Sequence, residues 1–579
     1  MASWAFWRTN GHTRHPQIMI AWNKASGPWR FRLLLGVVIM CVWGTALFTA
    51  SRSTLWDRDE SRYGTAALEM AASGNLLFPT FNHELRAYQP AMIYWLMSAS
   101  TRVFGPTEIA VRFPSTVAFA VICLLTALIA RSLATEKIAL AAAAIAGTTP
   151  LLFLMGTAAT TDAVLLGFIL LSQWVFVRAW CGGWRKWHVP AMGLAIGGGL
   201  LTKGPLGLLV PVLCIATALI IARGKSAASG DGWRLAAAAA IGLALFLAWG
   251  LPANAATGGD FWRIAVLERL PARIFTAMEG HGGGNLVGYI LHLPFYLVVL
   301  AVGSFPWTIY LPGMLAAPLG SDGKHWPVSA SGRQTLLKAM TLPPLVLFTL
   351  LATKLPHYIL PVAPWLAIGV ALLIAGDRMP TRASQMVRRC SLAASGTSTL
   401  LAAALIAAPF VLPALSDFRM PIVLSGLLVL ACVALALRAQ MASDFQSAAA
   451  VQAGGMVAFF WLCALVALPQ AETIAKPAQA LGRTGAPKLG PMTPVAAFEW
   501  TEPGIHFYLG GRKIERPPDA ESLVAWCRQP GPRAVVMRAD RQKDLSQSGL
   551  LAGFKVVAET SGYDHVRGGR VQLVMIYRD

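Results

Sequence analysis

The stretch LWDRDESRYGTAALEM gathers charge in a chain where Asp, Glu, Lys and Arg make up only 13% of the residues. Asp57, Asp59 and Glu60 fall within four positions, among Arg58 and Arg62. A carboxylate between arginines stays ionised, and burial in a cavity would raise its pKa toward that of a general base. The alternative is a solvated loop edge that holds local Asp–Arg pairs. The composition alone leaves both interpretations open.

Two later motifs place a charged group at the edge of an apolar segment. TTDAVLLGF has Asp162 at the start of one segment, where a helix dipole alone would stabilise an acid. LLTKGPLGLLVP interrupts an apolar hairpin at Lys203, and a tight turn explains its Gly and Pro. Lys203 itself is either a snorkelling end-anchor or a contact for phosphate.

The loop at 254–288 carries arginines and a glycine-rich run. The loop has Arg263, Glu268, Arg269 and Arg273, and the planar fork of arginine suits phosphate recognition. Three consecutive glycines would let backbone amides approach an anion. Glu279 and His281 form a lone Glu-x-His pair, which is a weak pattern for a divalent metal site.

A last motif, TKLPHYILPVAP, places Lys354, His357 and Tyr358 at the end of another apolar hairpin. It offers a cation and a hydroxyl to a phosphate. Together these motifs describe a cavity with acids on one wall and phosphate-binding cations on another.

The elements that must position these residues are membrane helices. The chain has 579 residues, 56% of them hydrophobic, and a mean hydropathy of +0.56. Recurrent apolar runs of about 18 residues indicate a polytopic α-helical membrane protein. The net charge of +21 reflects cations in short loops and does not indicate nucleic-acid binding. Eight scattered cysteines without a CxxC pattern indicate neither a disulfide framework nor a thiolate metal site.

About thirteen membrane spans are predicted. They cover 33–51, 109–131, 137–155, 162–181, 188–202, 205–223, 235–253, 289–316, 339–353, 357–375, 391–413, 421–438 and 450–470. Residues 1–32 are polar and precede a retained signal anchor. The short apolar stretch 91–104 is predicted to lie along the interface, as is the helix that Gly74 ends.

The loop cations test this topology. With a cytoplasmic N-terminus, alternate loops hold the basic clusters, as the positive-inside rule requires. These cytoplasmic cations are Lys137, Arg178, Arg185, Lys186, Arg223, Lys225, Arg234, Lys324, Arg333, Lys338, Arg378, Arg382, Arg388, Arg389 and Arg438. The first outer loop is then 52–108, and every motif described above faces the same outer side.

The composition changes near residue 471. Four stretches look like short strands: PVAAFEW, RAVVMRA, FKVVAET and VQLVMIYR. They are separated by two helix-like stretches, DAESLVAWCRQ and RQKDLSQSGL. The chain therefore divides into a cytoplasmic segment 1–32, a transmembrane domain 33–470 and an outer, soluble α/β domain 471–579.

DESRYGTAALEMAASGNLLFPTFN resembles the first-outer-loop signature of GT-C fold glycosyltransferases that use lipid-linked sugars. The chain also has stretches that resemble later motifs of that group, in the same order. They are TTDA, LTKGPLGLLVP, EGHGG with Pro306-Trp307, and KLPHYILPVAPW. The nearest branch is the lipid A aminoarabinose transferases, with the polyprenyl-phosphate-mannose protein mannosyltransferases as relatives. The resemblance covers about residues 50–375.

This resemblance implies transfer of a sugar from a polyprenyl phosphate to a lipid or glycan acceptor, usually with inversion. The reaction would take place on the periplasmic face of a bacterial inner membrane. Asp59 would be the main catalytic carboxylate, with Glu60 and Asp162 as helpers. The cations and hydroxyl for the donor phosphate would be Arg62, Lys203, Arg273, Lys354 and Tyr358. Further loop or acceptor contacts would be Asp57, Tyr63, Tyr88, Gln89 and His281.

One departure concerns the donor. The aminoarabinose branch carries a Y-F-E-K-P-P pattern, whereas this chain has Tyr88 and Gln89 where the acid and the lysine would stand. The sequence thus supports the reaction class but not that sugar. No cofactor is required by the motifs, and a divalent metal rests only on Glu279 and His281.

Two rival functions remain open. A lipid or polyanion transporter or flippase would use outer cations as a vestibule, but such proteins carry polar groups at mid-membrane depth. Here acidic residues are nearly absent inside the predicted spans. A catalytically dead scaffold for the outer domain is the third alternative, and the retained Asp59 and Asp162 argue against it.

Overall fold

The computed structural model describes most of the chain. The described residues are 28–56, 58–222, 232–276, 285–316, 326–376, 379–412, 416, 418–500, 502–563 and 569–579. Asp57, Glu279 and His281, which the sequence proposed as site residues, lie outside them.

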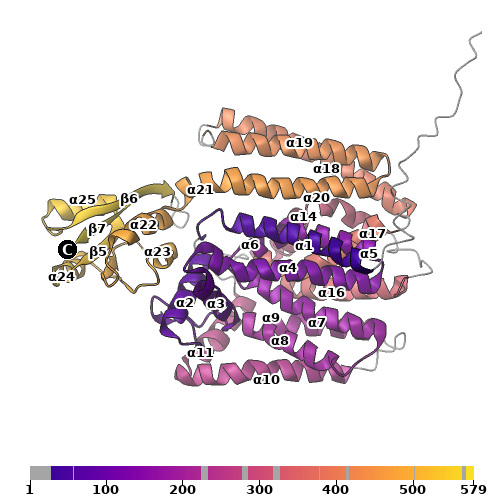
Figure 1. Ribbon diagram of the computed structural model, residues 1–579, viewed down its shortest axis with the longest axis horizontal. Coiled ribbons are helices and arrows are strands. Elements are labelled where there is room, and N and C mark those ends of the chain that lie inside the picture. Colours follow the sequence, from indigo (N-terminus) through magenta and orange to yellow (C-terminus); the bar gives the residue numbers. More distant parts are fainter. Residues whose placement is uncertain are drawn as a thin grey trace, which may run out of the picture.

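A bundle of long helices forms the larger part of the molecule (Figure 1). Its helices before the middle of the chain are α1 (Pro28–Ala50), α4 (Glu108–Leu133), α5 (Glu136–Gly147), α6 (Pro150–Thr157), α7 (Asp162–Gly182), α8 (His188–Lys203), α9 (Leu206–Ile221) and α10 (Gly232–Ala256). The later ones are α14 (Phe295–Gly303), α16 (Ala330–Leu350), α17 (Ala363–Ala375), α18 (Thr381–Val411), α19 (Arg419–Met441), α20 (Phe445–Leu462) and α21 (Leu468–Ala475). The chain is an integral membrane protein.

All thirteen predicted spans coincide with helical segments. In the described part of the chain, nine segments are long and apolar enough to cross a membrane, and α5 with α6 makes a tenth, bent by 62°. Helices α8, α9 and α16 account for the other three but fall short of the length or hydropathy of those spans. The number of crossings therefore remains a prediction.

The predicted span 289–316 is broken into short pieces. They are α13 (Leu286–Leu291), α14, the 3₁₀ turn η5 (Trp307–Tyr310) and α15 (Leu311–Ala316). Pro294 and Pro306 stand immediately before α14 and η5. Proline lacks a backbone N–H, so it starts a helix readily but interrupts one that would run through it.

Close helix contact shapes the hairpin that carries Lys203. A Cβ on Gly207 would lie 2.0 Å from the carbonyl carbon of Gly199, so only glycine lets α8 and α9 approach this closely. Gly204 makes the turn between them with φ +58°. The glycines that the sequence explains by a tight turn therefore also bring two backbones into contact, and they hold Lys203 at the end of the bundle.

The first outer loop forms two short helices and a hairpin. Helix α2 (Asp59–Ser73) ends at Gly74 in the left-handed conformation, as predicted, and α3 (Met92–Phe104) packs on it. Between them β1 (Thr80–Phe81) pairs with β2 (Glu84–Leu85). The buried carboxylate of Glu69 ties the hairpin to α2 by accepting bonds from Thr80 Oγ1 and from two backbone amides.

Further short helices follow α10. They are α11 (Asp260–Trp262), the π-helical turn η3 (Arg263–Glu268) and α12 (Arg269–Phe275), and the 3₁₀ turn η6 (Pro356–Val362) precedes α17. Backbone bonds join the end of α12 to the chain before η6: Ala352 N donates to Ile274 O at 3.1 Å, and Thr353 N donates to Arg273 O at 3.4 Å. These bonds bring the 254–288 loop next to the TKLPHY motif.

The C-terminal part is a five-stranded α/β unit at one end of the bundle, reached through α21 (Figure 1). Its strands, in the order β4-β3-β5-β7-β6, are β3 (Val495–Ala497), β4 (Ile514–Glu515), β5 (Arg533–Arg538), β6 (Lys555–Tyr563) and β7 (Arg570–Arg578). Its helices and turns are α22 (Pro477–Gly485), η9 (Ala486–Lys488), α23 (Pro503–Tyr508), α24 (Ala520–Arg528) and α25 (Ala539–Gln547). The four predicted strands and both predicted helices are confirmed, whereas β4, α22 and α23 were not predicted.

The C-terminal unit packs directly on the first outer loop. The Asn82 side chain exchanges two hydrogen bonds with the backbone of Ile514, at 2.7 and 3.1 Å. Tyr508 Oη accepts from Leu55 N and donates to Glu108, and the Phe507 ring lies against Gly64. The unit therefore holds the helix that carries Asp59.

His506 makes this interface sensitive to acid. Burial, and then the charge of Arg516, lowers the pKa of His506 to about 3, and its ring packs at a tilt against Phe81, with the ring centroids 4.8 Å apart. Above pH 6.5, the ordinary value, the imidazole is neutral in folded and unfolded chains, so the stability is fully present; it is lost as the pH falls toward 3. We expect the free energy of unfolding to drop by about 2 kcal/mol between pH 7 and pH 5. Thermal unfolding at both pH values measures this loss.

The matched variant is His506→Gln, which stays neutral over the whole range. It should lose clearly less stability than the native chain between the two pH values. An equal acid loss in both proteins would show that His506 is not the titrating group.

Candidate active site

Four side chains from three separate motifs meet at one end of the bundle. Asp162 is the first residue of α7, and its Oδ1 lies 2.5 Å from Lys203 Nζ, at the end of α8. His357 Nε2 lies 3.8 Å from the same oxygen. The Lys203 ammonium also lies over the ring of Tyr358, 5.2 Å from its centroid. The TTDA, LTKGP and KLPHY motifs therefore converge.

These four side chains border a small cavity. Asp162, Lys203, His357 and Tyr358 line its polar end, and apolar side chains of α7, α9 and η6 line the rest. The cavity has room for about one water molecule. Because the salt bridge is nearly inaccessible to solvent, its charges attract each other more strongly than exposed ones would.

Asp59 lies in the first turn of α2 and is exposed. Its charge acts electrostatically on Tyr63, Tyr94 and His357, and the charge of Asp162 acts on Tyr63 and His357 as well. Both carboxylates therefore lie within electrostatic range of Tyr63 and His357. Asp59 is the accessible acid of the pair, whereas Asp162 is held by Lys203.

Glu60 is buried and hydrogen-bonded, whereas Asp59 is exposed. Its oxygens accept from Arg112 Nε at 2.9 Å, Arg112 Nη2 at 2.5 Å, Trp56 N at 2.8 Å and Ala159 N at 2.6 Å. Burial raises the pKa of Glu60, but the Arg112 charge and these hydrogen bonds outweigh it, so the pKa lies below its ordinary value. With both oxygens occupied, Glu60 has no free lone pair aimed at a substrate. The prediction of Glu60 as a helper in the chemical step does not fit this geometry.

Arg112 completes the arrangement. Besides Glu60, its guanidinium donates to the carbonyls of Ala50 at 2.8 Å, Ser53 at 2.6 Å and Thr54 at 2.8 Å. All five N–H groups of the side chain are therefore used. The pair joins the end of α1, the start of α2 and the turn before Asp162, and so it fixes the relative positions of the Asp59 and Asp162 backbones.

Tyr63 is a buried phenol within electrostatic range of both acids. Burial raises its pKa above the ordinary value; neighbouring Tyr94 and the charges of Asp59 and Asp162 raise it further, while Arg86 opposes them. The phenol is therefore protonated at neutral pH and can donate a hydrogen bond.

The structure places the predicted phosphate-binding cations in different surroundings. Arg273, half-buried on α12, lies within electrostatic range of His357. Arg62 is half-buried in the first turn of α2. Lys354 is used elsewhere: its ammonium donates to the carbonyls of Thr349 and Leu351 at the C-terminus of α16. That geometry explains Lys354 as a helix cap, and the structure does not bring it to the acids.

Tyr88 and Gln89 lie between β2 and α3. Gln89 is buried, whereas Tyr88 is partly exposed and its ring contacts the guanidinium groups of Arg86 and Arg269. Sequence reasoning missed Arg86 and Arg112 as site residues, and it named Arg269 only as one of the loop arginines suited to phosphate recognition. Arg112 had a signal that could have found it, because an arginine inside a predicted span must be paired.

Metal binding finds no support in the described residues, among which no group of three or more His, Cys, Asp or Glu side chains could hold an ion. The hypothesis of a divalent metal at Glu279 and His281 concerns residues outside that part of the chain, and it stays a prediction.

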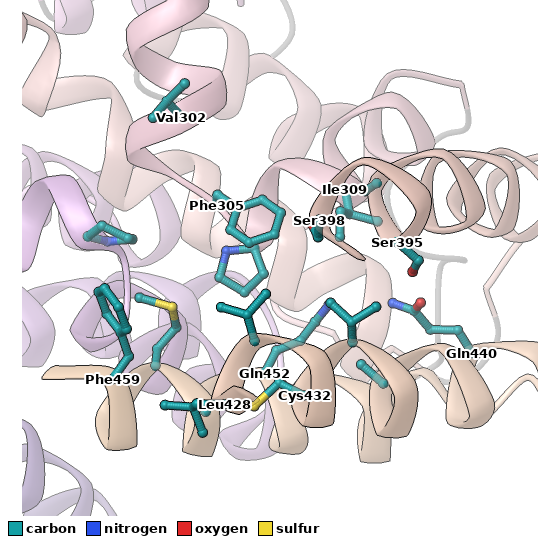
Figure 2. Close-up of a pocket in the computed structure, with 18 residues that line it drawn as sticks. Val302, Phe305, Ile309, Ser395, Ser398, Leu428, Cys432, Gln440, Gln452 and Phe459 are labelled. Atoms are coloured by element: carbon teal, nitrogen blue, oxygen red, sulfur yellow. The ribbon is translucent and has the colours of Figure 1, made fainter. Parts of the chain in front are cut away.

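A separate apolar pocket lies among the later helices. It has a volume of about 230 Å³ and is formed by α14, η5, α18, α19 and α20 (Figure 2). Phe305, Leu428 and Phe459 point into it, and Ser395 and Gln440 lie toward one end. No charged side chain lines it, and it shares no residue with the Asp162 cavity. It does not contribute to the candidate active site.

The sequence of the chain is similar to known glycosyltransferases. Residues 88–250 match the dolichyl-phosphate-mannose-protein mannosyltransferase family. An undecaprenyl phosphate-alpha-4-amino-4-deoxy-L-arabinose arabinosyl transferase of Sodalis glossinidius is 31% identical over 346 residues, 58% of this chain and 59% of the relative. One of the same description from Pseudomonas aeruginosa is 30% identical over 319 residues, 54% of this chain and 55% of the relative. The matched stretch thus spans less than two thirds of these relatives.

The fold is shared with a protein of known structure. ArnT from Cupriavidus metallidurans, in a crystal structure with bound undecaprenyl phosphate, superposes with a TM-score of 0.74 over 95% of this chain and 98% of that chain, at 20% identity. Its apo structure gives a TM-score of 0.72. The GT-C fold class and the resemblance to aminoarabinose transferases and protein mannosyltransferases are therefore confirmed.

Proposed function

We propose that this chain is an integral-membrane glycosyltransferase. It moves a sugar from a polyprenyl phosphate, of the undecaprenyl type, to a lipid or glycan acceptor. The observation that carries the proposal is the convergence of Asp162, Lys203, His357 and Tyr358 from three separate motifs, with Asp59 and Arg273 near enough for their charges to act on His357. The similarity to enzymes named for undecaprenyl phosphate-linked donors supports the donor class.

The bond changes of an inverting transfer match these groups. An acceptor oxygen forms a bond to the anomeric carbon while the bond from that carbon to the phosphate oxygen breaks. The phosphate leaves with the bonding electron pair, and cations stabilise its growing charge. Where the acceptor is a hydroxyl, its proton passes to the exposed carboxylate of Asp59.

Asp162 has a supporting role in this scheme. Its ion pair holds the ammonium of Lys203 and orients His357 beside the reacting phosphate. Glu60 and Lys354 are left out of the chemical step, because their polar atoms are engaged in buried contacts.

The location of the site follows from the loop charges. We place the active site on the periplasmic side of a bacterial inner membrane, with the N-terminus in the cytoplasm. The transmembrane domain is then 33–470 and the periplasmic domain 471–579. The acceptor and the sugar stay open, since Tyr88 and Gln89 replace the acid and the lysine of the aminoarabinose pattern.

A transfer assay tests the function. Purified protein is incubated with radiolabelled polyprenyl-phosphate hexoses and pentoses, the aminoarabinose donor included, and with lipid A or another glycolipid acceptor. We expect label to appear in the acceptor with one donor. If no donor supports transfer while vesicles containing the protein move a lipid-linked sugar between leaflets, the chain is a flippase.

A further inference from the structure

A second polar cavity lies at the far end of the bundle from Asp162. Helices α4 and α7 pack side by side and both run away from the C-terminal unit (Figure 1). Near their ends they carry Arg131 and Arg178, and Arg178 lies about 24 Å along α7 from Asp162. The ends of these helices, the turn after α7 and the start of α8 enclose about 520 Å³, a volume typical of ligand sites.

Three arginines line this cavity, and among the described residues that line it none is acidic. Arg131 forms a partly exposed salt bridge with Glu136. Arg178 and Arg185 form no ion pair with a carboxylate in the described part of the chain. Both of their guanidinium groups lie within electrostatic range of the His188 ring, so the two positive charges act on the same region.

The turn that carries Arg185 is held in place. Arg185 N donates to His188 Nδ1 at 2.9 Å, and His188 N donates back to Arg185 O at 3.0 Å. The buried His188 ring lies 4.1 Å from the ring of Trp187, which lies 6.3 Å from that of Trp174. A cation on a fixed backbone loses less entropy when it binds a ligand.

The helix ends do not account for these charges. The C-termini of α4 and α7 carry about half a negative charge each, and the N-terminus of α8 carries about half a positive charge. Three guanidinium groups exceed that demand, even with Glu136 beside Arg131. Cations that only fix the topology would need no cavity. An excess of positive charge in a cavity favours an anionic ligand.

The walls of the cavity change from apolar to cationic within about one helical turn. On α4, Leu128 precedes Arg131, and on α7, Trp174 precedes Arg178. The neighbouring Trp187 is of a residue type that is enriched at membrane–water boundaries. A phospholipid matches this order, because its acyl chains adjoin a charged phosphate. A soluble phosphate would use the arginines but not the apolar part.

We propose that Arg131, Arg178 and Arg185 bind the phosphate headgroup of an anionic membrane phospholipid, such as phosphatidylglycerol. The guanidinium forks would donate to the phosphate diester, and basic pockets between membrane helices suit such headgroups. This site goes beyond the proposed function, since it lies at the other end of the bundle from the reacting groups. With Asp162 on the periplasmic side, as proposed, the bound lipid belongs to the cytoplasmic leaflet.

Lipid titration of the full-length protein in detergent, followed by native mass spectrometry, tests the site without requiring transfer. The probes are phosphatidylglycerol and the zwitterionic phosphatidylcholine with the same acyl chains. We expect Arg178→Gln/Arg185→Gln to weaken binding of phosphatidylglycerol about tenfold or more, because two charged hydrogen-bond forks are lost. Binding of phosphatidylcholine should not change. Both side chains are exposed, so this double variant should fold.

The chain offers a control with the same change of charge. Arg382 and Arg389 are exposed on α18, outside the cavity and on the same predicted side of the membrane. Arg382→Gln/Arg389→Gln should bind phosphatidylglycerol as the native chain does. Arg178→Lys/Arg185→Lys should keep part of the affinity, because it retains the charges and loses the forks. An equal loss in the two glutamine variants would overturn the proposal, since it would indicate attraction to a basic surface in general.

Thermal unfolding gives a second measurement. Saturating phosphatidylglycerol should raise the midpoint of the native chain and of the control, and should raise that of Arg178→Gln/Arg185→Gln less. Unchanged affinity of this variant for phosphatidylglycerol would overturn the proposal. So would a loss confined to inorganic phosphate, which would assign the arginines to a soluble anion. A chain that binds phosphatidylglycerol in this way but transfers no sugar would contradict the proposed function and leave the site intact.

Discussion

Replacing Asp59 by asparagine is expected to lower the rate of sugar transfer to a hydroxyl acceptor by about 10²- to 10⁴-fold, the range for loss of a general base. Asp59 is exposed in the first turn of α2, so the change removes a charge without opening a cavity. The loss should appear in kcat, with little change in KM for the donor. Initial rates with a radiolabelled polyprenyl-phosphate sugar measure it.

Two variants sharpen that experiment. Asp59→Glu keeps a carboxylate and should retain more activity than Asp59→Asn, although a longer side chain misplaces the base. Asp540→Asn, at an exposed acid of the C-terminal unit, is the control and should transfer at the native rate. Undiminished transfer by Asp59→Asn would remove Asp59 from the mechanism.

Breaking the Glu60–Arg112 pair should cause the largest loss of stability. Both side chains are buried, and Arg112→Gln leaves the Glu60 carboxylate charged and without its cation. Removal of one partner of a buried ion pair costs about 3–5 kcal/mol. Denaturant titration in detergent micelles, followed by tryptophan fluorescence, measures the change in the free energy of unfolding.

The chain offers a matched control for this pair. Arg131 and Glu136 form a salt bridge of 2.8 Å in which both side chains are about 40% exposed. Arg131→Gln should cost no more than about 1 kcal/mol. A similar cost at Arg112 would mean that burial does not strengthen the Glu60 pair.

The double variant Glu60→Gln/Arg112→Gln separates structure from chemistry. Two neutral side chains leave no buried charge, so the double variant should be more stable than Arg112→Gln alone. If it folds and transfers sugar at a rate near that of the native chain, Glu60 acts only by positioning α2 and the turn before Asp162. A double variant that folds but transfers no sugar would indicate that Glu60 takes part in the chemical step.

Several elements were predictable because their signals are local. Apolar length alone locates every helical segment of the bundle, since each span must bury its own backbone bonds. Short apolar, strand-like runs locate β3, β5, β6 and β7 in the C-terminal unit, and Gly74 marks the end of α2. The two-residue strand β4 and the proline breaks in 289–316 lie below the resolution of such patterns.

The partners of charged side chains were not predictable in the same way. Glu60 and Asp59 are adjacent and chemically alike, yet one is buried against Arg112 and the other is exposed. Lys203 and Lys354 both follow an apolar helix, but one pairs with Asp162 and the other caps α16. Which lysine or acid is available for substrate depends on contacts between residues 40 or more positions apart, except for the local cap.

The sequence by itself determined the membrane class, the C-terminal α/β unit and the reaction class that the motifs resemble, and it predicts that the motifs share one side of the membrane. These follow from hydropathy, loop charge and short motifs, which neighbouring residues specify. Only the tertiary structure decided that Glu60 is held by Arg112, that Lys354 is a cap, and that Arg86 and Arg269 meet at Tyr88. Burial and ion pairing arise from packing between distant segments, and a linear sequence does not record that packing.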